Sequence, residues 1–214
     1  MAEVKKKKHF ILIHGACHGA WCWYKLKPRL ESAGHRVTAV DMAASGINTN
    51  QIQAVHSMYE YTKPLLEILA SLPDDEKAIL VGHSLGGLNL ALAMDKYPQK
   101  ISAAVFLTAF MPDTAHKPSF VLEQYWGRTP PEAWLDTQFA PYGEPEESLM
   151  SMFFGPKFLT FKLYQLSPVE VFKGSGAGKG SDQARIIVRS RFIEDKQVVK
   201  RNVRKCSSSV HCVQ

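Results

Sequence analysis

The sequence predicts an α/β fold, built on a parallel, doubly wound sheet with helices on both faces. Short apolar runs rich in β-branched residues alternate with segments of helical spacing over residues 9–110, which is typical of such a sheet. An aromatic, proline-rich stretch follows at residues 111–170. With 214 residues, 45% of them hydrophobic, the chain is long enough to bury one substantial core.

The predicted elements follow one another in regular alternation. Each strand is a short apolar run, and each helix carries apolar residues three or four positions apart. The strands are predicted at residues 9–15, 35–42, 77–82 and 101–110. The helices are predicted at residues 20–34, 57–72 and 85–98, and Gly34 and Pro98 end the first and the last of them.

Residues 111–170 predict a lid over the sheet. Prolines break this stretch into short pieces, and aromatic residues lie between them. In open α/β sheets ligands bind at the C-terminal edge of the strands, so we expect the lid to cover that edge. The prolines are Pro112, Pro118, Pro130, Pro131, Pro141, Pro145, Pro156 and Pro168.

The chain changes again near Val171. We divide it into a core with its lid at residues 1–172 and a divergent basic tail at residues 173–214, expected to be disordered or non-native. The tail carries ten Lys or Arg and three acidic residues, whereas the rest carries 16 and 17. A basic tail can bind nucleic acid or an anionic membrane, but the absence of interleaved aromatic residues argues against both. Its stretch "RIIVRSRFI" predicts at most a short strand.

The composition favours a cytoplasmic protein. There is no apolar run of 18 residues, so no membrane span is expected. The basic start "MAEVKKKKHFILIHG" has an apolar run too short for a secretory signal. The cysteines, Cys17, Cys22, Cys206 and Cys212, lack the paired spacing of a zinc site and are expected to be reduced.

The stretch "VGHSLGG" at residues 81–87 indicates a nucleophile. Gly82-x-Ser84-x-Gly86 between a predicted strand and a predicted helix matches a nucleophile elbow, in which a tight turn exposes the serine. The flanking glycines are needed because side chains there would collide with neighbouring backbone. The alternative is a glycine-rich turn without chemistry.

A serine that attacks a carbonyl carbon also needs two backbone donors for the tetrahedral oxyanion. Leu85 N–H lies at the start of the helix after Ser84, and Ala16 N–H lies in the loop after the first strand, so we predict these two donors. His14 and His18 in that loop are interpreted as residues that order it, because the catalytic base of this fold follows the serine along the chain.

At these residues the chain resembles a known family. The stretches "FILIHGACHGAWCWYKLKPRLESAGHRVTAVDMAASG", "VGHSLGG" and "FMPD" resemble the plant methylesterase family, which includes salicylate-binding esterases, polyneuridine aldehyde esterase and α-hydroxynitrile lyases. The resemblance runs from about Lys8 to Glu170. It implies the α/β-hydrolase fold with a lid and hydrolysis of small methyl esters such as methyl salicylate, methyl jasmonate and methyl indole-acetate.

Within that family the chain resembles the esterases. The lyases carry threonine at the position of Gly15 and cysteine at that of Leu85, where they would engage a cyanohydrin. Gly15 and Leu85 leave an apolar site that suits an ester carbonyl. The resemblance implies no metal or cofactor, a small ester or carboxylic acid as the partner, and neither nucleic acid nor membrane; it leaves a homodimer open.

The resemblance also implies an acyl pocket in the lid. An aromatic slot there favours a flat or apolar acyl group. For each residue, a plain role in the packing of the lid is the alternative. The implied lining residues are Phe110, Tyr125, Trp134, Phe139 and Met152.

The other two members of the catalytic triad are not found in the sequence. The order in this fold is Ser, then Asp or Glu, then His, and the family has its His in a G-x-D-H context. After Ser84 the histidines are His116, at the start of the lid, and His211, which has no such motif. Asp182 and Asp195 are equally unsupported as the acid.

The resemblance stops near Glu170, and we interpret the chain from about residue 171 as the product of a frameshift, a mis-spliced exon or a gene-model error. In a frame shifted by one base, codons that can encode Ser175–Lys179 specify DLELAK, a helix start of the kind the family carries there. The last strands and helix of the fold would then be missing. That loss would expose a sheet edge and impair catalysis.

Three functions therefore remain open. The first is a serine methylesterase impaired by the missing base. The second is a non-catalytic binder of a salicylate-like ligand, and the third is a non-functional product of an aberrant transcript. A nucleotide site is excluded, because in "GSGAGKGS" Lys179 is followed by Gly180 and the glycine spacing differs from that of a phosphate loop.

Overall fold

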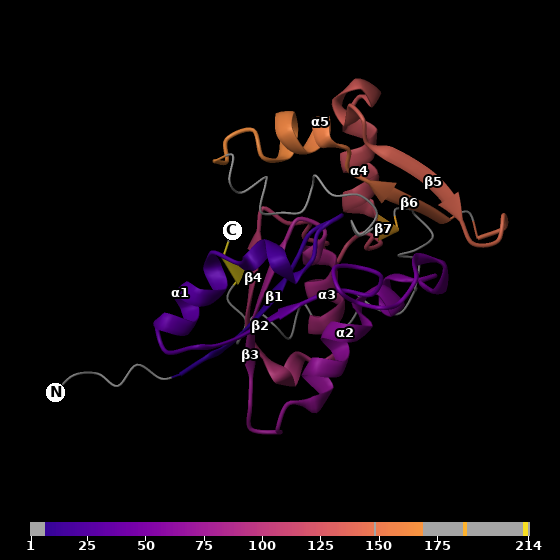
Figure 1. Ribbon diagram of the computed structural model, residues 1–214. Helices are drawn as coiled ribbons and strands as arrows, with labels where there is room; N and C mark the ends of the chain where they lie inside the picture. The colour runs from indigo at the N-terminus through magenta and orange to yellow at the C-terminus, as the bar shows by residue number, and fades with distance from the viewer. Residues whose placement is uncertain (1–6, 148, 169–185, 188–211, 214) are drawn as a thin grey trace.

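Four parallel strands form the centre of the molecule. In the computed structural model, which describes residues 7–147, 149–168, 186–187 and 212–213, they follow the order β2-β1-β3-β4 (Figure 1). The predicted parallel α/β sheet is confirmed. The strands are β1 (His9–Ile13), β2 (Arg36–Val40), β3 (Ala78–His83) and β4 (Ile101–Leu107).

Both faces of the sheet are covered, as Figure 1 shows. Successive residues of β1 point to opposite faces, and all of Ile11, Leu12 and Ile13 are buried. Ile11 and Ile13 pack in the main core with α2 (Met58–Ser71) and α3 (Gly86–Lys96). Leu12 packs on the other face, with α1 (Leu26–Ser32) and the 3-10 turn η1 (Ala20–Trp23) beside it. Because both faces of β1 are covered, its residues are apolar without alternation.

The helix predicted at residues 20–34 was wrong as one element. The chain forms η1 and then, after a break, α1. Proline inside an α-helix clashes with the carbonyl four residues earlier, which for Pro28 is that of Tyr24. Pro28 is the third residue of α1, where its missing N–H costs nothing, so the α-helix begins only at Leu26.

The helices predicted at residues 57–72 and 85–98 are confirmed as α2 and α3. α2 begins after Ser57, whose side chain accepts a hydrogen bond from Glu60 N–H at 3.1 Å and so caps the helix. α3 begins directly after the serine turn. Short 3-10 turns precede α2 and follow α3, namely η2 (Ile52–Ala54) and η3 (Pro98–Lys100).

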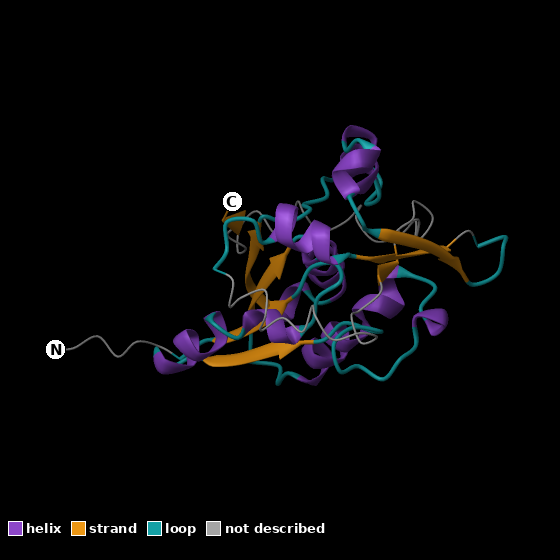
Figure 2. Ribbon diagram, turned by 45° about the horizontal axis from the view of Figure 1, so that its top comes forward, coloured by secondary structure: helices purple, strands orange, loops and turns teal. Residues whose placement is uncertain are grey.

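The lid lies beyond the C-terminal ends of the strands (Figures 1 and 2). It contains an antiparallel hairpin of β5 (Gln138–Tyr142) and β6 (Leu149–Phe153), which the sequence did not predict. A buried cluster that includes Cys17, Trp134 and Met152 joins the lid to the loop after β1. The remaining lid elements are α4 (Phe120–Arg128), η4 (Pro131–Trp134), α5 (Pro156–Phe158) and the π-helical turn η5 (Leu159–Leu163).

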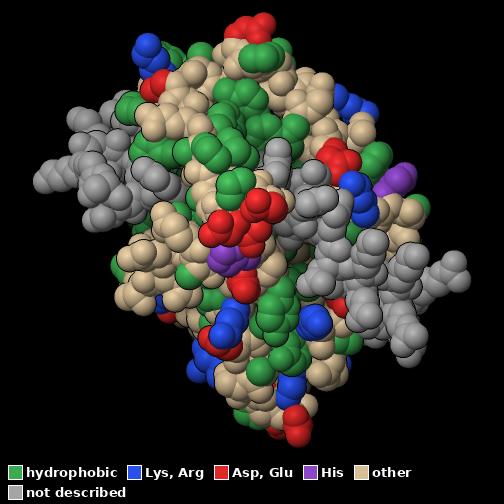
Figure 3. Space-filling model, turned by 90° about the vertical axis from the view of Figure 1, so that its right-hand side faces the viewer, with side chains coloured by type: hydrophobic (Ala, Val, Ile, Leu, Met, Phe, Trp, Pro, Cys, Tyr) green, Lys and Arg blue, Asp and Glu red, His purple; other side chains and the backbone are tan. Residues whose placement is uncertain are grey.

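A seam of polar contacts joins the hairpin to the loop before α2. Tyr142 O–H donates to Val55 C=O at 2.8 Å, and His56 Nδ1 lies 3.0 Å from Glu147 Oε1. On this side of the molecule, Figure 3 shows acidic side chains gathered around a histidine. The lid is therefore attached to the core at this seam as well as through its apolar cluster.

Two short strands belong to the predicted tail. β7 (Ile186–Ile187), within "RIIVRSRFI", pairs with β6, and β8 (Cys212–Val213) lies parallel to β4 opposite Ala104 and Val105. The β4 edge, which we expected to be open, is thus paired at these two residues. The remainder of the tail lies outside the described residues. Within the described chain, each helix is too short or too polar to span a bilayer.

Candidate active site

Ser84 occupies a strained turn between β3 and α3. Its φ of 53° lies in the left-handed region, which non-glycine residues rarely adopt. Ser84 N–H donates to Thr108 C=O at 3.2 Å, and Ser84 C=O accepts from Gly87 N–H at 3.1 Å and from Phe110 N–H at 3.0 Å. These bonds hold the strained backbone in place, and strain of this kind concentrates at functional sites.

The turn leaves no room for side chains at its flanking glycines. A Cβ at Gly86 would lie 2.8 Å from Ile13 O, and one at Gly82 would lie 2.7 Å from Leu90 Cδ1. A Cβ at Gly15 would lie 2.9 Å from Ser84 Cβ. The loop after β1 therefore approaches the serine closely because Gly15 carries no side chain.

Strained residues follow every one of the four central strands. Cys17 after β1, Ala44 after β2, Ser84 after β3 and Thr108 after β4 all have φ between 45° and 55°. The carboxyl ends of parallel strands meet at one edge, so these residues lie along the same edge of the sheet. This clustering marks the edge beneath the lid as the candidate site.

The two predicted donors lie beside the serine. Ala16, Ser84 and Leu85 line one cavity. Leu85 immediately precedes the first residue of α3, so the dipole of that helix adds to the field at its N–H. Neither Ala16 N–H nor Leu85 N–H donates a hydrogen bond to any residue in the described parts of the chain. Both groups are therefore free to bind a developing negative oxygen.

The histidines near the serine are uncharged at neutral pH. Burial lowers the pKa of His14 and of His18 from 6.5 to about 4. Burial also lowers the pKa of His83, which lines the cavity next to Ser84. The site thus presents hydrogen-bonding groups and dipoles rather than fixed positive charge.

A cavity of about 530 Å³ separates Ser84 from the lid. Among the predicted pocket residues, Phe110, Tyr125, Trp134 and Met152 line it. Gly15 and Phe139 do not line the cavity. Gly15 lies close to Ser84, as its lack of a side chain allows. Phe139 packs edge-on against Trp126 and Trp134, with ring centroids 5.4 and 5.5 Å apart.

Sequence reasoning missed part of the lining. Leu122, Trp126, Phe154 and Leu163 also face the cavity. Leu122, Tyr125 and Trp126 are three and four positions apart on α4, the spacing that brings side chains to one helical face. This helical spacing could therefore have predicted that Leu122 and Trp126 face the cavity with Tyr125. Trp126 stacks on Trp134 with ring centroids 4.6 Å apart, which gives the cavity a flat aromatic wall.

No histidine among the described residues hydrogen-bonds Ser84 Oγ. His14 and His18 bond to loop carbonyls, and His116 bonds to Asp113 while its ring stacks on Phe120. The other candidates from the sequence, His211, Asp182 and Asp195, lie outside the described residues. The described part of the site therefore holds a strained serine and two free backbone N–H groups, without an imidazole bonded to the serine.

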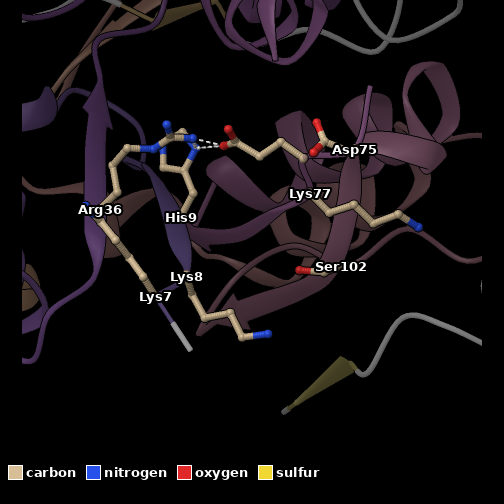
Figure 4. Close-up of a pocket in the computed structure, with 8 residues that line it drawn as sticks. Lys7, Lys8, His9, Arg36, Asp75, Lys77 and Ser102 are labelled. Atoms are coloured by element: carbon tan, nitrogen blue, oxygen red, sulfur yellow. Dashed lines mark hydrogen bonds and ion pairs between the residues drawn. The ribbon is translucent and has the colours of Figure 1, made fainter. Parts of the chain in front are cut away.

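A second cavity of about 530 Å³ lies at the opposite, N-terminal edge of the sheet (Figure 4). Three of its side chains form one cluster: Arg36 forms an ion pair with Glu76, and His9 Nδ1 lies beside the Arg36 guanidinium and 3.0 Å from Glu76 Oε1. Among the described residues that line it, one carries a hydroxyl: Ser102 donates to Ala78 C=O at 3.0 Å. The strained backbone lies at the other edge of the sheet, so the candidate active site is the cavity at Ser84.

Comparison with known proteins agrees with this geometry. Residues 8–146 match the family model of the alpha/beta hydrolase fold. The chain is 61% identical to salicylic acid-binding protein 2 of Nicotiana tabacum over 92% of this chain and 73% of that protein. It is 62% identical to Methylesterase 1 of Arabidopsis thaliana over 79% of this chain and 65% of that protein.

A solved structure is similar as well. A mutant of polyneuridine aldehyde esterase superposes with a TM-score of 0.80 at 46% identity, covering 89% of this chain and 72% of that one. The chain therefore belongs to the plant methylesterase family of α/β hydrolases. It spans about two thirds to three quarters of the length of these relatives.

Proposed function

We propose that the chain binds a small carboxylic methyl ester in the cavity beneath the lid and that Ser84 attacks its carbonyl carbon. The observation that carries this proposal is a strained serine that shares an aromatic cavity with two free N–H donors. Ala16 N–H and Leu85 N–H would hold the oxyanion. The stacked Trp126 and Trp134 suit a flat acyl group such as that of methyl salicylate, and methyl jasmonate and methyl indole-acetate belong to the same substrate class.

Turnover is proposed to be slow. Attack by Ser84 must release its hydroxyl proton, and no described imidazole is bonded to that oxygen to accept it. Triad members act as a unit, so loss of the base leaves only binding and oxyanion stabilisation. We expect a turnover rate about 10⁶-fold below that of a relative with a complete triad, because removing the histidine of a triad costs about that much.

A second function is favoured because no described imidazole is bonded to Ser84 Oγ. A cavity that keeps its aromatic wall and its donors but lacks a base can bind a carboxylic acid of the salicylate type without turnover. One relative bears the name salicylic acid-binding protein 2. Binding without a Ser84-dependent reaction would identify this second function.

One experiment separates the two functions. Salicylate binding is measured by calorimetry, and methyl salicylate hydrolysis by the fluorescence of released salicylate, for the natural chain, Ser84→Ala and Ser32→Ala. Ser32 is exposed at the end of α1, so its variant serves as the matched control. We expect all three to bind salicylate, and slow hydrolysis that only Ser84→Ala loses would identify the first function. Absence of binding in the natural chain would refute both functions.

A further inference from the structure

The loop after β1 is held by two histidines that do not reach the nucleophile. His14 Nε2 accepts from Met42 N–H at 3.1 Å, so its proton is on Nδ1, which donates to Gly15 C=O at 2.8 Å. In a trans peptide the C=O and the following N–H point in opposite directions. The bond from His14 to Gly15 C=O therefore fixes the direction of Ala16 N–H from the core side.

His18 fixes the next peptide in the same way. Its Nδ1 lies 2.7 Å from Ala16 O and its Nε2 lies 2.6 Å from Tyr164 Oη. A carbonyl oxygen only accepts, so Nδ1 carries the proton and Nε2 accepts from Tyr164 O–H. Burial lowers the pKa of His18 to about 4, which keeps Nε2 unprotonated at neutral pH. Trp21 stacks on the imidazole at 5.0 Å and restricts its rotation.

The partner of His18 belongs to the lid. Tyr164 directly follows η5 and packs against the apolar cluster between the lid and the loop. The same loop reaches the lid at a second point, where Cys17 S–H donates to Met152 C=O at 3.4 Å. Ala16 is thus flanked by one peptide anchored in the core and one anchored in the lid.

We propose that Tyr164 and His18 are positioning residues, which hold the Ala16–Cys17 peptide through the chain of hydrogen bonds from Tyr164 O–H to His18 to Ala16 C=O. The core, through His14, and the lid, through Tyr164, then together fix the backbone of Ala16, whose N–H is the oxyanion donor. This inference rests on the proposed function, because it gives Ala16 N–H the role of an oxyanion donor. Neither residue touches the reacting atoms. Both act through the loop backbone, so lid closure and transition-state binding become coupled.

The hydrogen-bond chain can be tested without any reaction. In ¹⁵N spectra of the natural chain at pH 7, His18 is expected as the neutral Nδ1–H tautomer. Tyr164→Phe removes one hydroxyl and is expected to shift the Ala16 amide resonance, whereas Tyr24→Phe, at a half-exposed tyrosine near the same loop, is not. An Nε2–H tautomer or an imidazolium at His18, or an unmoved Ala16 amide in Tyr164→Phe, would overturn the inference.

The effect on the oxyanion site is tested with phenylboronic acid. Ser84 Oγ adds to boron, its proton passes to buffer, and the tetrahedral anion places an oxygen at the donors. We expect Tyr164→Phe to weaken boronate binding about tenfold, part of the 10²–10³-fold loss seen when an oxyanion donor is removed outright. Salicylate binding should change less than about twofold, since ground-state binding makes less use of the donor.

The possible outcomes distinguish a failure of this inference from a failure of the proposed function. Equal weakening of boronate and salicylate would indicate general damage to the pocket and would overturn the coupling, as would no weakening of either. If the natural chain forms no boronate adduct at all, the proposed role of Ser84 fails. The tautomer of His18 and the Ala16 amide then still decide whether the lid holds the loop.

Discussion

The backbone at Ser84 keeps its geometry because neighbouring chain segments approach it from both sides. Gly86 faces the carbonyls of Ile13 and His14 at the end of β1, and Gly15 faces Ser84 itself. Such close approach is available only without a Cβ. The motif is therefore a packing requirement as well as a sequence pattern.

A pair of glycine substitutions tests this packing. Gly86→Ala would place a Cβ 2.8 Å from Ile13 O and is expected to destabilise the protein by about 1–3 kcal/mol through overpacking. Gly127→Ala on α4 meets no atom within 4 Å and should stabilise by about 0.5–1 kcal/mol, because alanine favours helix. Urea unfolding measures both. A Gly86→Ala variant as stable as the natural chain would contradict the packing argument.

At the residue scale, local motifs predicted the site residues at the ends of the strands better than those of the lid. Ser84, Ala16 and Leu85 come together because strand ends meet at one sheet edge, a rule that the sequence order already contains. Trp126 and Leu122 reach the cavity through the way α4 packs in the lid, and Phe139 turns against the tryptophans. Lid packing depends on contacts between distant residues, which local patterns do not record.

At the element scale, the seam between the β5–β6 hairpin and the loop before α2 combines contacts of different strength. The hydrogen bond from Tyr142 O–H to Val55 C=O is partly buried. The pair of His56 and Glu147 is exposed, at 42 and 37% of side-chain surface. Exposed ion pairs contribute little because solvent screens them.

Two substitutions at the seam should differ accordingly. Tyr142→Phe removes the hydroxyl donor and is expected to lower the free energy of unfolding by about 1 kcal/mol. Glu147→Gln removes one charge of the exposed pair and should change it by less than about 1 kcal/mol, with the change smaller at high salt. Urea unfolding at low and high salt checks this order. A larger loss for Glu147→Gln than for Tyr142→Phe would show that the ion pair dominates the seam.

The elements that the sequence missed depend on tertiary contacts. β5 is an exposed strand that contains Pro141, and proline is confined to the edges of sheets. Its pairing with β6 defines it as a strand, and its own pattern shows no alternation. The break between η1 and α1 could, in contrast, have been predicted from Pro28. The alternating strands and helices of the core were predicted correctly because both have clear periodicity.

At the scale of the whole molecule, buried histidines couple folding to pH. Burial lowers the pKa of His9, His14 and His18 from 6.5 to about 4, and Arg36 adds to the effect at His9. Between these values the unfolded chain binds more protons than the folded chain, so stability rises with pH. This stabilisation is complete above pH 6.5 and is lost as the pH falls from 6.5 toward 4.

Unfolding at several pH values tests this coupling. Each of the three histidines should contribute a slope of up to about 1.4 kcal/mol per pH unit between pH 4 and 6.5. The urea midpoint is therefore expected to fall steeply from pH 7 to pH 5, and His9→Gln should make the decline shallower. Exposed carboxylates such as Asp113, whose pKa is lowered by its bonds to His116, act only at lower pH. A midpoint that stays constant from pH 7 to pH 5 would refute the coupling.

The central claim is that Ser84 is the nucleophile of the site. The most direct measurement is mass-spectrometric mapping of the chain after long incubation with a fluorophosphonate, which forms a phosphonyl ester with a serine oxygen and releases fluoride. We predict a slow, single modification on the peptide of residues 78–96, which contains Ser84, and none in Ser84→Ala. Modification of a different peptide, or equal modification of Ser84→Ala, would contradict the account.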